Sequence, residues 1–266
     1  MSALQLLGFF GLGSLVGAFG TMIGVGGGFL LLPLLLLAYP HDSPSVLTGI
    51  SLMVVCANAT AGSFAYARMR RTDVRAGLVF AAAGMPGSVL GALATAWLDR
   101  RVFEPLLGAM LLVGAAAIVV RPRPAPVPPT GYHTLVEADG TVHRYRRPLV
   151  AGAVLSVFVG FVSSLLGIGG GILHVPLMVL VLGFPIHIAT ATSHLVLAIL
   201  ALVGVAAHVA DGSLRPGLER ALPLVAGVVV GAPFGAWASG RVRGAWILRA
   251  LAAALAVAGL RLLLVR

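Results

Sequence analysis

Two short glycine-rich segments interrupt the longest apolar stretches of the sequence. Each reads Gly-X-Gly-Gly-Gly, and each is followed by a proline five residues after its last glycine, at Pro33 and Pro176. Irregular backbone at membrane depth occurs only where protein or a water-filled cavity surrounds it. The free N–H groups and positive dipole end of a following helix favour an anion at such a place. We therefore expect six glycines to bind a small anion through their backbone: Gly26, Gly27, Gly28, Gly169, Gly170 and Gly171.

The alternative role for these glycines is close packing between helices, which we expect for the pairs Gly87/Gly91 and Gly231/Gly235. The occurrence of two matched segments favours a binding site. On this interpretation, replacing Gly27 and Gly170 with valine abolishes substrate binding and leaves a folded protein.

Two pairs of hydroxyl side chains follow the glycine segments. Thr48 and Ser51 are three residues apart, as are Thr190 and Ser193, so on a helix the two hydroxyls of each pair lie on one face. We expect these four residues to contribute to the same substrate site. The alternative is that they bond carbonyl groups of their own or a neighbouring helix, as intramembrane Ser and Thr often do.

His174 and His194 lie within apolar stretches of the second half, and His208 lies near the end of one. His174 and His194 stand where the first half has Leu31 and Leu52. Histidine can take up a proton that moves with or against an anion, so both are candidates for proton coupling, and His194 is also a candidate substrate ligand. The alternative is a neutral histidine bonded to a backbone carbonyl. Because His187, His194 and His208 have no i,i+4 partner and no carboxylate companion, we expect no metal site.

Carboxylates are confined to polar links and to the ends of apolar stretches. Most cation-coupled carriers need an intramembrane carboxylate, whereas such a group would repel an anion. An anionic substrate is therefore favoured, with a cation carrier as the alternative within transport. The glycine segments lack the Lys-Ser/Thr of a phosphate-binding loop, and no nucleophile motif is present. We expect no catalytic residue and no cofactor; an intramembrane enzyme is the less favoured alternative.

The composition indicates an all-α polytopic membrane protein. Of the 266 residues, 59% are hydrophobic and 10% are charged. We expect the lipid bilayer and a small anion as partners and no nucleic acid, and a homodimer is left open. Apolar stretches separated by short polar links cover residues 4–38, 46–66, 77–97, 105–120, 149–183, 188–210, 221–239 and 245–265. The stretches 4–38 and 149–183 are each about 52 Å long as one helix, well beyond a ~30 Å hydrocarbon core, so each must break or double back.

The chain is an internal duplication, because its motifs recur in order after about 143 residues. Residues 1–120 are predicted to form the first transmembrane repeat and residues 149–266 the second. The Pro- and Arg-rich residues 121–148 form a linker between them. Within this linker, residues alternate around Asp139-Gly140, which is typical of a β-hairpin with a type I′ turn.

Two threadings of the long stretches are compatible with the arginine distribution. If each doubles back as a re-entrant hairpin, each repeat crosses three times and the repeats are inverted. Loops 67–76, 121–148 and 240–244 then share one side of the membrane. If each crosses once, the repeats are parallel. Arginine counts place loop 67–76 and the linker in the cytoplasm under both schemes. The short segments after the glycines favour re-entrant helices that meet near the midplane, hence inverted repeats.

The sequence resembles the sulfite exporter TauE/SafE family of membrane permeases over nearly its full length. The resemblance rests on the duplicated glycine segment with its proline (residues 24–33 and 167–176), on the later Thr/Ser pairs and on the Arg-Ala-Gly entry at residues 75–77. It implies a multi-pass protein of the bacterial inner membrane. It also implies secondary transport, in the export direction, of sulfite, sulfoacetate or related organosulfonates, with carboxylates as an alternative substrate class.

Overall fold

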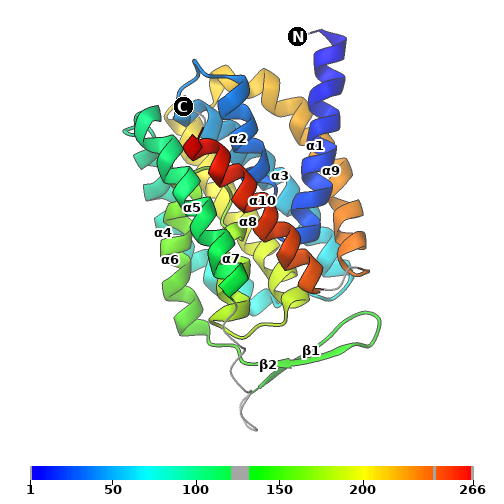
Figure 1. Ribbon diagram of the computed structural model, residues 1–266. Helices are drawn as coiled ribbons and strands as arrows, with labels where there is room; N and C mark the ends of the chain where they lie inside the picture. The colour runs from blue at the N-terminus through cyan, green and yellow to red at the C-terminus, as the bar shows by residue number, and fades with distance from the viewer. Residues whose placement is uncertain (1, 121–131, 242–243, 265–266) are drawn as a thin grey trace.

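The computed structural model describes residues 2–120, 132–241 and 244–264, and these residues are mostly helical (Figure 1). In chain order the elements are α1 (Ala3–Ile23), α2 (Gly28–Ala38), α3 (Pro44–Arg68), α4 (Val74–Thr95), α5 (Arg100–Val120), β1 (His133–Val136), β2 (Val142–Tyr145), α6 (Leu149–Leu165), α7 (Gly171–Leu180), α8 (Ile186–Ala210), the short 3₁₀ helix η1 (Arg215–Gly217), α9 (Leu218–Ser239) and α10 (Gly244–Leu264).

The helices have the length and the surface of membrane spans. Within the described residues, five segments are long and apolar enough to cross a bilayer: Ala3–Ile23, Pro44–Arg68, Val74–Thr95, Ile186–Ala210 and Arg215–Ser239. Large apolar side chains are widely exposed on the bundle, among them Leu4 at 81% and Trp97 at 89%. An exposed apolar surface of this kind fits lipid and not water. The chain is a helical polytopic membrane protein, and the β-hairpin predicted around Asp139-Gly140 is confirmed.

Both long apolar stretches are interrupted at their glycine segments. α1 ends at Ile23, where Gly24 takes the left-handed conformation with a φ of 93°, and α2 begins at Gly28. α6 ends at Leu165, and α7 begins at Gly171. α2 has 11 residues and α7 has 10, so each is about 15–17 Å long, roughly half of a ~30 Å hydrocarbon core.

The outer helices pair through glycine contacts. α1 and α9 run parallel, since Gly13 lies against Leu224 and Gly17 against Val228. α4 and α6 also run parallel, with Gly91 against Phe161. A Cβ atom added at any of four glycines would lie 2.0–2.1 Å from a carbonyl oxygen of the facing helix: Gly87, Gly91, Gly231 and Gly235. The close-packing role predicted for these two pairs is confirmed.

The central helices α3 and α8 run antiparallel. Gly49 of α3 lies against His208 near the end of α8, whereas Gly62 lies against His194 near its start. α5 and α10 are antiparallel in the same way, with Gly108 next to Leu263 and Gly114 next to Leu255. α3 and α8 carry the predicted hydroxyl pairs, and all four of these residues are buried.

The β-hairpin lies at the end of the bundle away from both termini (Figure 1). Its strands pair in the register His133↔Tyr145 to Val136↔Val142. The predicted type I′ turn is wrong: Gly140 has a φ of 86°, but Asp139 does not share a positive φ, which type I′ requires. Instead the amide of Gly140 donates to the Glu137 carbonyl and the Asp139 carboxylate accepts from the Thr141 amide, which is the longer, bulged form of the loop.

Three polar segments meet at this end of the bundle. The Ala138 amide in the hairpin loop donates a 3.0 Å hydrogen bond to the carbonyl of Met69, between α3 and α4. The guanidinium of Arg71 lies beside Gly240, which follows α9. The α3–α4 loop, the hairpin and the end of α9 therefore lie on one side of the molecule.

Candidate functional site

The two glycine segments lie against each other at the centre of the bundle. A Cβ atom at Gly28 would lie 2.7 Å from the carbonyl oxygen of Ile168, and one at Gly171 would lie 2.4 Å from the Cα of Val25. Gly26 and Gly169 both face Val55 of α3. The absence of side chains at these positions lets the two backbones approach closely, and so brings the starts of α2 and α7 together.

Backbone donors at this crossing have no protein partner. In the described part of the chain, the amides of Gly27, Gly28 and Phe29 donate no hydrogen bond, and neither do those of Gly169, Gly170 and Gly171. These groups stand at the N-terminal ends of α2 and α7, where helix dipoles add positive charge. The crossing therefore presents two sets of backbone donors without a partner among the described residues.

The hydroxyl pairs connect each glycine segment to the other half of the chain. Ser51 Oγ donates to the Gly167 carbonyl at 2.6 Å, and Ser193 Oγ donates to the Gly24 carbonyl at 3.3 Å. The two serines thus bond carbonyls across the interface, which is the alternative considered above for them. The hydroxyls of Thr48 and Thr190 are buried and have no hydrogen-bond partner among the described residues. The threonines are therefore the hydroxyls left available to a ligand or water.

The two glycine segments tolerate added side chains differently. Gly27 has a φ of 81°, and a Cβ there would lie 2.5 Å from the Val16 side chain and 2.9 Å from the Val16 carbonyl oxygen. The expectation that Gly27→Val leaves a folded protein is therefore wrong, because both the backbone and the neighbour resist it. Gly170 has a φ of −42°, and a Cβ there would meet nothing closer than 3.1 Å.

His194 lies in a buried polar cluster with three side chains that sequence reasoning missed, namely Thr21, Asn58 and Tyr66. Thr21 Oγ1 donates to Asn58 Oδ1 at 2.9 Å, and the Tyr66 hydroxyl donates to the Thr21 carbonyl at 2.7 Å. The Tyr66 and His194 rings meet edge to face at 5.4 Å between centroids. Asn58 is the one asparagine in the sequence and lies inside an apolar stretch, which is the signal that marks it. Asn58 Nδ2 and His194 Nε2 have no partner within the described residues.

His174 occupies a second buried position, beside Gly170. Its Nε2 lies 3.0 Å from Ser156 Oγ, and its ring stacks on Phe80 at 6.4 Å. A Cβ at Gly170 would lie 3.4 Å from both His174 Nδ1 and Ser163 Oγ. His174 Nδ1 has no partner among the residues described. His174 and His194 thus each have one buried ring nitrogen without a partner in the part of the chain that the structure describes.

Acidic residues lie outside the crossing and are mostly paired. Asp73 is buried at the start of α4 and accepts hydrogen bonds from the Ala76 amide and the Tyr145 hydroxyl. Burial and the neighbouring Asp73 carboxylate raise the pKa of Tyr145 above its ordinary value, so this hydroxyl remains a donor. Glu137 bonds Arg71 at 2.5 Å and His143 at 2.7 Å. In residues 2–120, 132–241 and 244–264, no group of His, Cys, Asp and Glu side chains could hold a metal ion.

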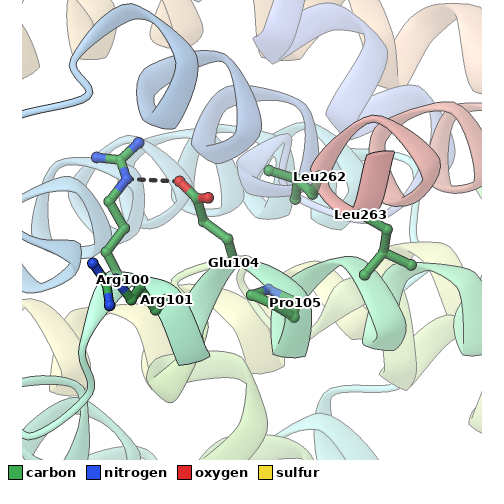
Figure 2. Close-up of a pocket in the computed structure, with 6 residues that line it drawn as sticks. All are labelled: Arg100, Arg101, Glu104, Pro105, Leu262 and Leu263. Atoms are coloured by element: carbon green, nitrogen blue, oxygen red, sulfur yellow. Dashed lines mark hydrogen bonds and ion pairs between the residues drawn. The ribbon is translucent and has the colours of Figure 1, made fainter. Parts of the chain in front are cut away.

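A groove of about 690 Å³ opens between α5 and α10, and it contains none of the predicted site residues (Figure 2). Glu104 there holds Arg100 Nε at 2.6 Å. The guanidinium of Arg100 also donates to carbonyl oxygens at and beyond the end of α2: Leu36, Tyr39, Pro40 and Asp42. A cation at the C-terminal end of a helix stabilises its exposed carbonyls. Arg100 therefore fixes the outer end of α2.

Comparison with known proteins gives a consistent assignment. The profile of the family described as Sulfite exporter TauE/SafE matches residues 9–262. The chain is 28% identical over 234 residues to the probable membrane transporter protein YunE of Bacillus subtilis, covering 85% of each chain. It is 26% identical over 186 residues to a probable membrane transporter protein of Methanocaldococcus jannaschii, covering 68% of this chain and 64% of the relative. A probable membrane transporter protein of Xylella fastidiosa is 29% identical over 185 residues, which is 70% of this chain and 67% of that protein.

No solved structure matches the chain. The family match runs from within α1 to within α10 and includes both glycine segments, and the relatives are named as transporters. The chain is therefore a membrane transporter and not an enzyme, and it belongs to the sulfite exporter TauE/SafE family.

Proposed function

We propose that this protein exports small sulfur-containing anions, such as sulfite, sulfoacetate or related organosulfonates, through a site at the crossing of its two glycine segments. The observation that carries the proposal is the convergence of unpartnered donors at that crossing. The amides of Gly27, Gly28, Gly170 and Gly171 belong to the two crossing segments. Thr48 and Thr190, whose hydroxyls have no partner among the described residues, pack against Gly167 and Gly24 of the same segments. Because no described carboxylate lies among them, an anion gains hydrogen bonds there without charge repulsion.

The proposal includes an internal duplication with inverted repeats, residues 1–120 and 149–266, each containing a re-entrant helical hairpin. The contacts support this by their reciprocity: Gly24 lies against Thr190, and Gly167 lies against Thr48. The equivalent helices α3 and α8 run antiparallel, as do α5 and α10. Two halves with equivalent helices antiparallel and with reciprocal contacts are the arrangement that inverted-repeat transporters use for alternating access.

We further propose that the protein lies in the bacterial inner membrane with residues 121–148 in the cytoplasm. Of this linker, residues 121–131 lie outside the described part of the chain. The contact between Arg71 and Gly240 supports the inverted threading, because the parallel threading would put loop 240–244 on the opposite side from loop 67–76. The arginines of these loops then obey the positive-inside rule.

Thermal unfolding of the purified protein in detergent tests the substrate class. The panel, at matched ionic strength, contains sulfite, sulfoacetate, thiosulfate, sulfate, a dicarboxylate and chloride. Selective binding to the folded state raises stability by about 2.7 kcal/mol at a hundredfold excess over Kd. We expect a shift with sulfite or the sulfonate and none with chloride. A shift with sodium ions alone would instead indicate a cation carrier.

Transport direction is tested separately in proteoliposomes. Sulfite is loaded inside or outside vesicles of known protein orientation, and a proton gradient is imposed. We expect sulfite to move from the side that corresponds to the cytoplasm to the opposite side. Accumulation on the side that corresponds to the cytoplasm would contradict export and leave the anion site standing.

A further inference from the structure

We propose that the cluster around Asn58 and His194 selects oxyanions that carry a hydroxyl group, that is, singly protonated oxyanions. The inference rests on the proposed anion transport and narrows it: among the anions proposed above, the site favours sulfite as its singly protonated form over the organosulfonates, whose sulfonate group carries no hydroxyl. A bound hydroxyl would donate to His194, while the charged oxygens accept from Asn58 and from the backbone amides. Four observations support this assignment.

First, the hydrogen bond of His194 fixes its tautomer. Nδ1 lies 3.1 Å from the carbonyl oxygen of Thr190, which can only accept, so Nδ1 carries the hydrogen. In the neutral ring, Nε2 is therefore a bare acceptor. His194 is 0% exposed, and Nε2 has no partner among the described residues. A buried acceptor without a donor is unfavourable, and a ligand hydroxyl would satisfy it.

Second, Asn58 supplies the complementary donor. Its Oδ1 accepts from Thr21, so the amide is oriented, and both hydrogens of Nδ2 remain without a partner in the described residues. Asn58 is also 0% exposed. An amide donor and an imidazole acceptor in one buried cluster match a group that has both a negatively charged oxygen and an O–H.

Third, the helix geometry places the two groups near each other. Gly62 lies one turn beyond Asn58 on the same face of α3. A Cβ there would lie 2.5 Å from His194 Cδ2, 3.1 Å from His194 Nε2 and 3.0 Å from Thr21 Cγ2. The missing side chain at Gly62 thus admits the His194 ring against α3. The Tyr66 ring meets the His194 ring edge to face, and the Tyr66 hydroxyl is committed to the Thr21 carbonyl.

Fourth, the equivalent positions of the other half are apolar. Gly204 is the counterpart of Gly62, and a Cβ there would lie 2.9 Å from Leu52, the counterpart of His194. The counterpart of Asn58 is Leu200, which is buried. The donor and acceptor therefore occur on one side of the pseudo-symmetric crossing only. Packing alone accommodates leucine at these places, so packing does not account for the asparagine and histidine.

The experiment compares two probes, methylphosphonate as its monoanion and methanesulfonate. The two have the same charge and nearly the same shape, and only the phosphonate carries a hydroxyl. Their Kd values for the full-length protein in detergent are measured by isothermal titration calorimetry at one pH and ionic strength. We expect methylphosphonate to bind at least about tenfold more tightly, because a site built around a hydroxyl rejects the analogue that lacks it.

His194→Leu should reduce this preference to nearly one, with methanesulfonate binding retained. His194→Gln keeps an acceptor oxygen and should retain part of the preference. Asn58→Leu should weaken both probes by a similar factor. Leu52→Met and Leu200→Met, at the matched positions of the other half, should leave both Kd values unchanged.

Each outcome has a distinct meaning. Equal binding of both probes to the wild-type protein overturns the inference and leaves the proposed anion site intact. A preference that persists in His194→Leu also overturns it, since another group then reads the hydroxyl. Failure of every anion in the earlier panel would instead contradict the proposed function. The wild-type ratio decides the first question even where a variant fails to fold.

Discussion

Ser51 of α3 donates a 2.6 Å hydrogen bond to the carbonyl of Gly167, in the glycine segment of the opposite half. Ser193 of α8 makes the reciprocal bond to the Gly24 carbonyl at 3.3 Å. Each interruption of the helix exposes carbonyls that have lost their intrahelical partners. A serine from the other half satisfies one of them, so the two halves stabilise each other's irregular backbone.

Ser51→Ala should destabilise the protein by about 1–3 kcal/mol, because the Gly167 carbonyl remains buried after it loses its donor. Unfolding in detergent micelles by titration with sodium dodecyl sulfate measures this loss. Hydrogen exchange should also increase locally in residues 167–173. The matched control is Ser193→Ala, whose longer bond predicts a smaller loss. Equal effects of the two substitutions would argue against this ranking.

Gly170→Ala should leave the fold intact and weaken anion binding. The φ of −42° accepts an L side chain, and the new methyl group would lie 3.4 Å from His174 Nδ1 and Ser163 Oγ. The methyl group therefore occupies space next to donors of the proposed site. We expect an unchanged unfolding midpoint together with a Kd raised by about tenfold, measured with the best anion of the panel.

Gly27→Ala is the contrasting variant. Its left-handed backbone alone costs about 1–2 kcal/mol with an L residue, and the Val16 carbonyl oxygen would lie 2.9 Å from the new atom. Stability should therefore fall clearly before binding is considered. If Gly27→Ala and Gly170→Ala were equally stable, the conformational difference between the two glycine segments would have no energetic consequence.

Local signals in the sequence predicted the elements better than they predicted the site. The glycine runs marked both helix interruptions because few other residues adopt φ values such as the 93° of Gly24. The i,i+3 spacing also placed Thr48 and Ser51 on one buried face. The spacing does not predict which hydroxyls lack a hydrogen-bond partner. That depends on carbonyl groups far away in the sequence, since Ser51 bonds the Gly167 carbonyl 116 residues away.

Asn58 and the hairpin loop show two further limits. A single asparagine in an apolar stretch is a visible signal, but its role depends on Thr21 and His194, which come from other helices. The Asp139-Gly140 pair indicated a tight turn, yet the hairpin loop is longer. Its Ala138 amide bonds Met69, and Glu137 bonds Arg71. The hairpin loop thus has its longer form where it docks onto the α3–α4 loop. The strand pattern alone does not predict this contact or the loop form.

Tyr145→Phe should loosen the hairpin from the bundle. The Tyr145 hydroxyl donates a 2.8 Å bond to Asp73, whose side chain is buried, and its ring packs on Phe184 at 4.8 Å. Loss of the hydroxyl leaves the carboxylate with one fewer donor and costs about 1–3 kcal/mol of docking free energy. Limited proteolysis should then cleave the hairpin faster. Tyr132→Phe, at a 40% exposed position, is the control and should cleave at the wild-type rate.

Cysteine labelling distinguishes the two threadings of the repeats. In a Cys56→Ala background, single cysteines are placed at Asp139 in the hairpin, Gly240 after α9 and Ser213 before α9. The hairpin and Gly240 meet at Arg71, whereas Ser213 lies at the other end of α9. Inverted repeats therefore predict that a membrane-impermeant maleimide labels Ser213→Cys in intact spheroplasts, and labels Asp139→Cys and Gly240→Cys only after lysis. Labelling of Asp139→Cys and Ser213→Cys from the same side, with Gly240→Cys opposite, would establish the parallel arrangement and contradict the proposed one.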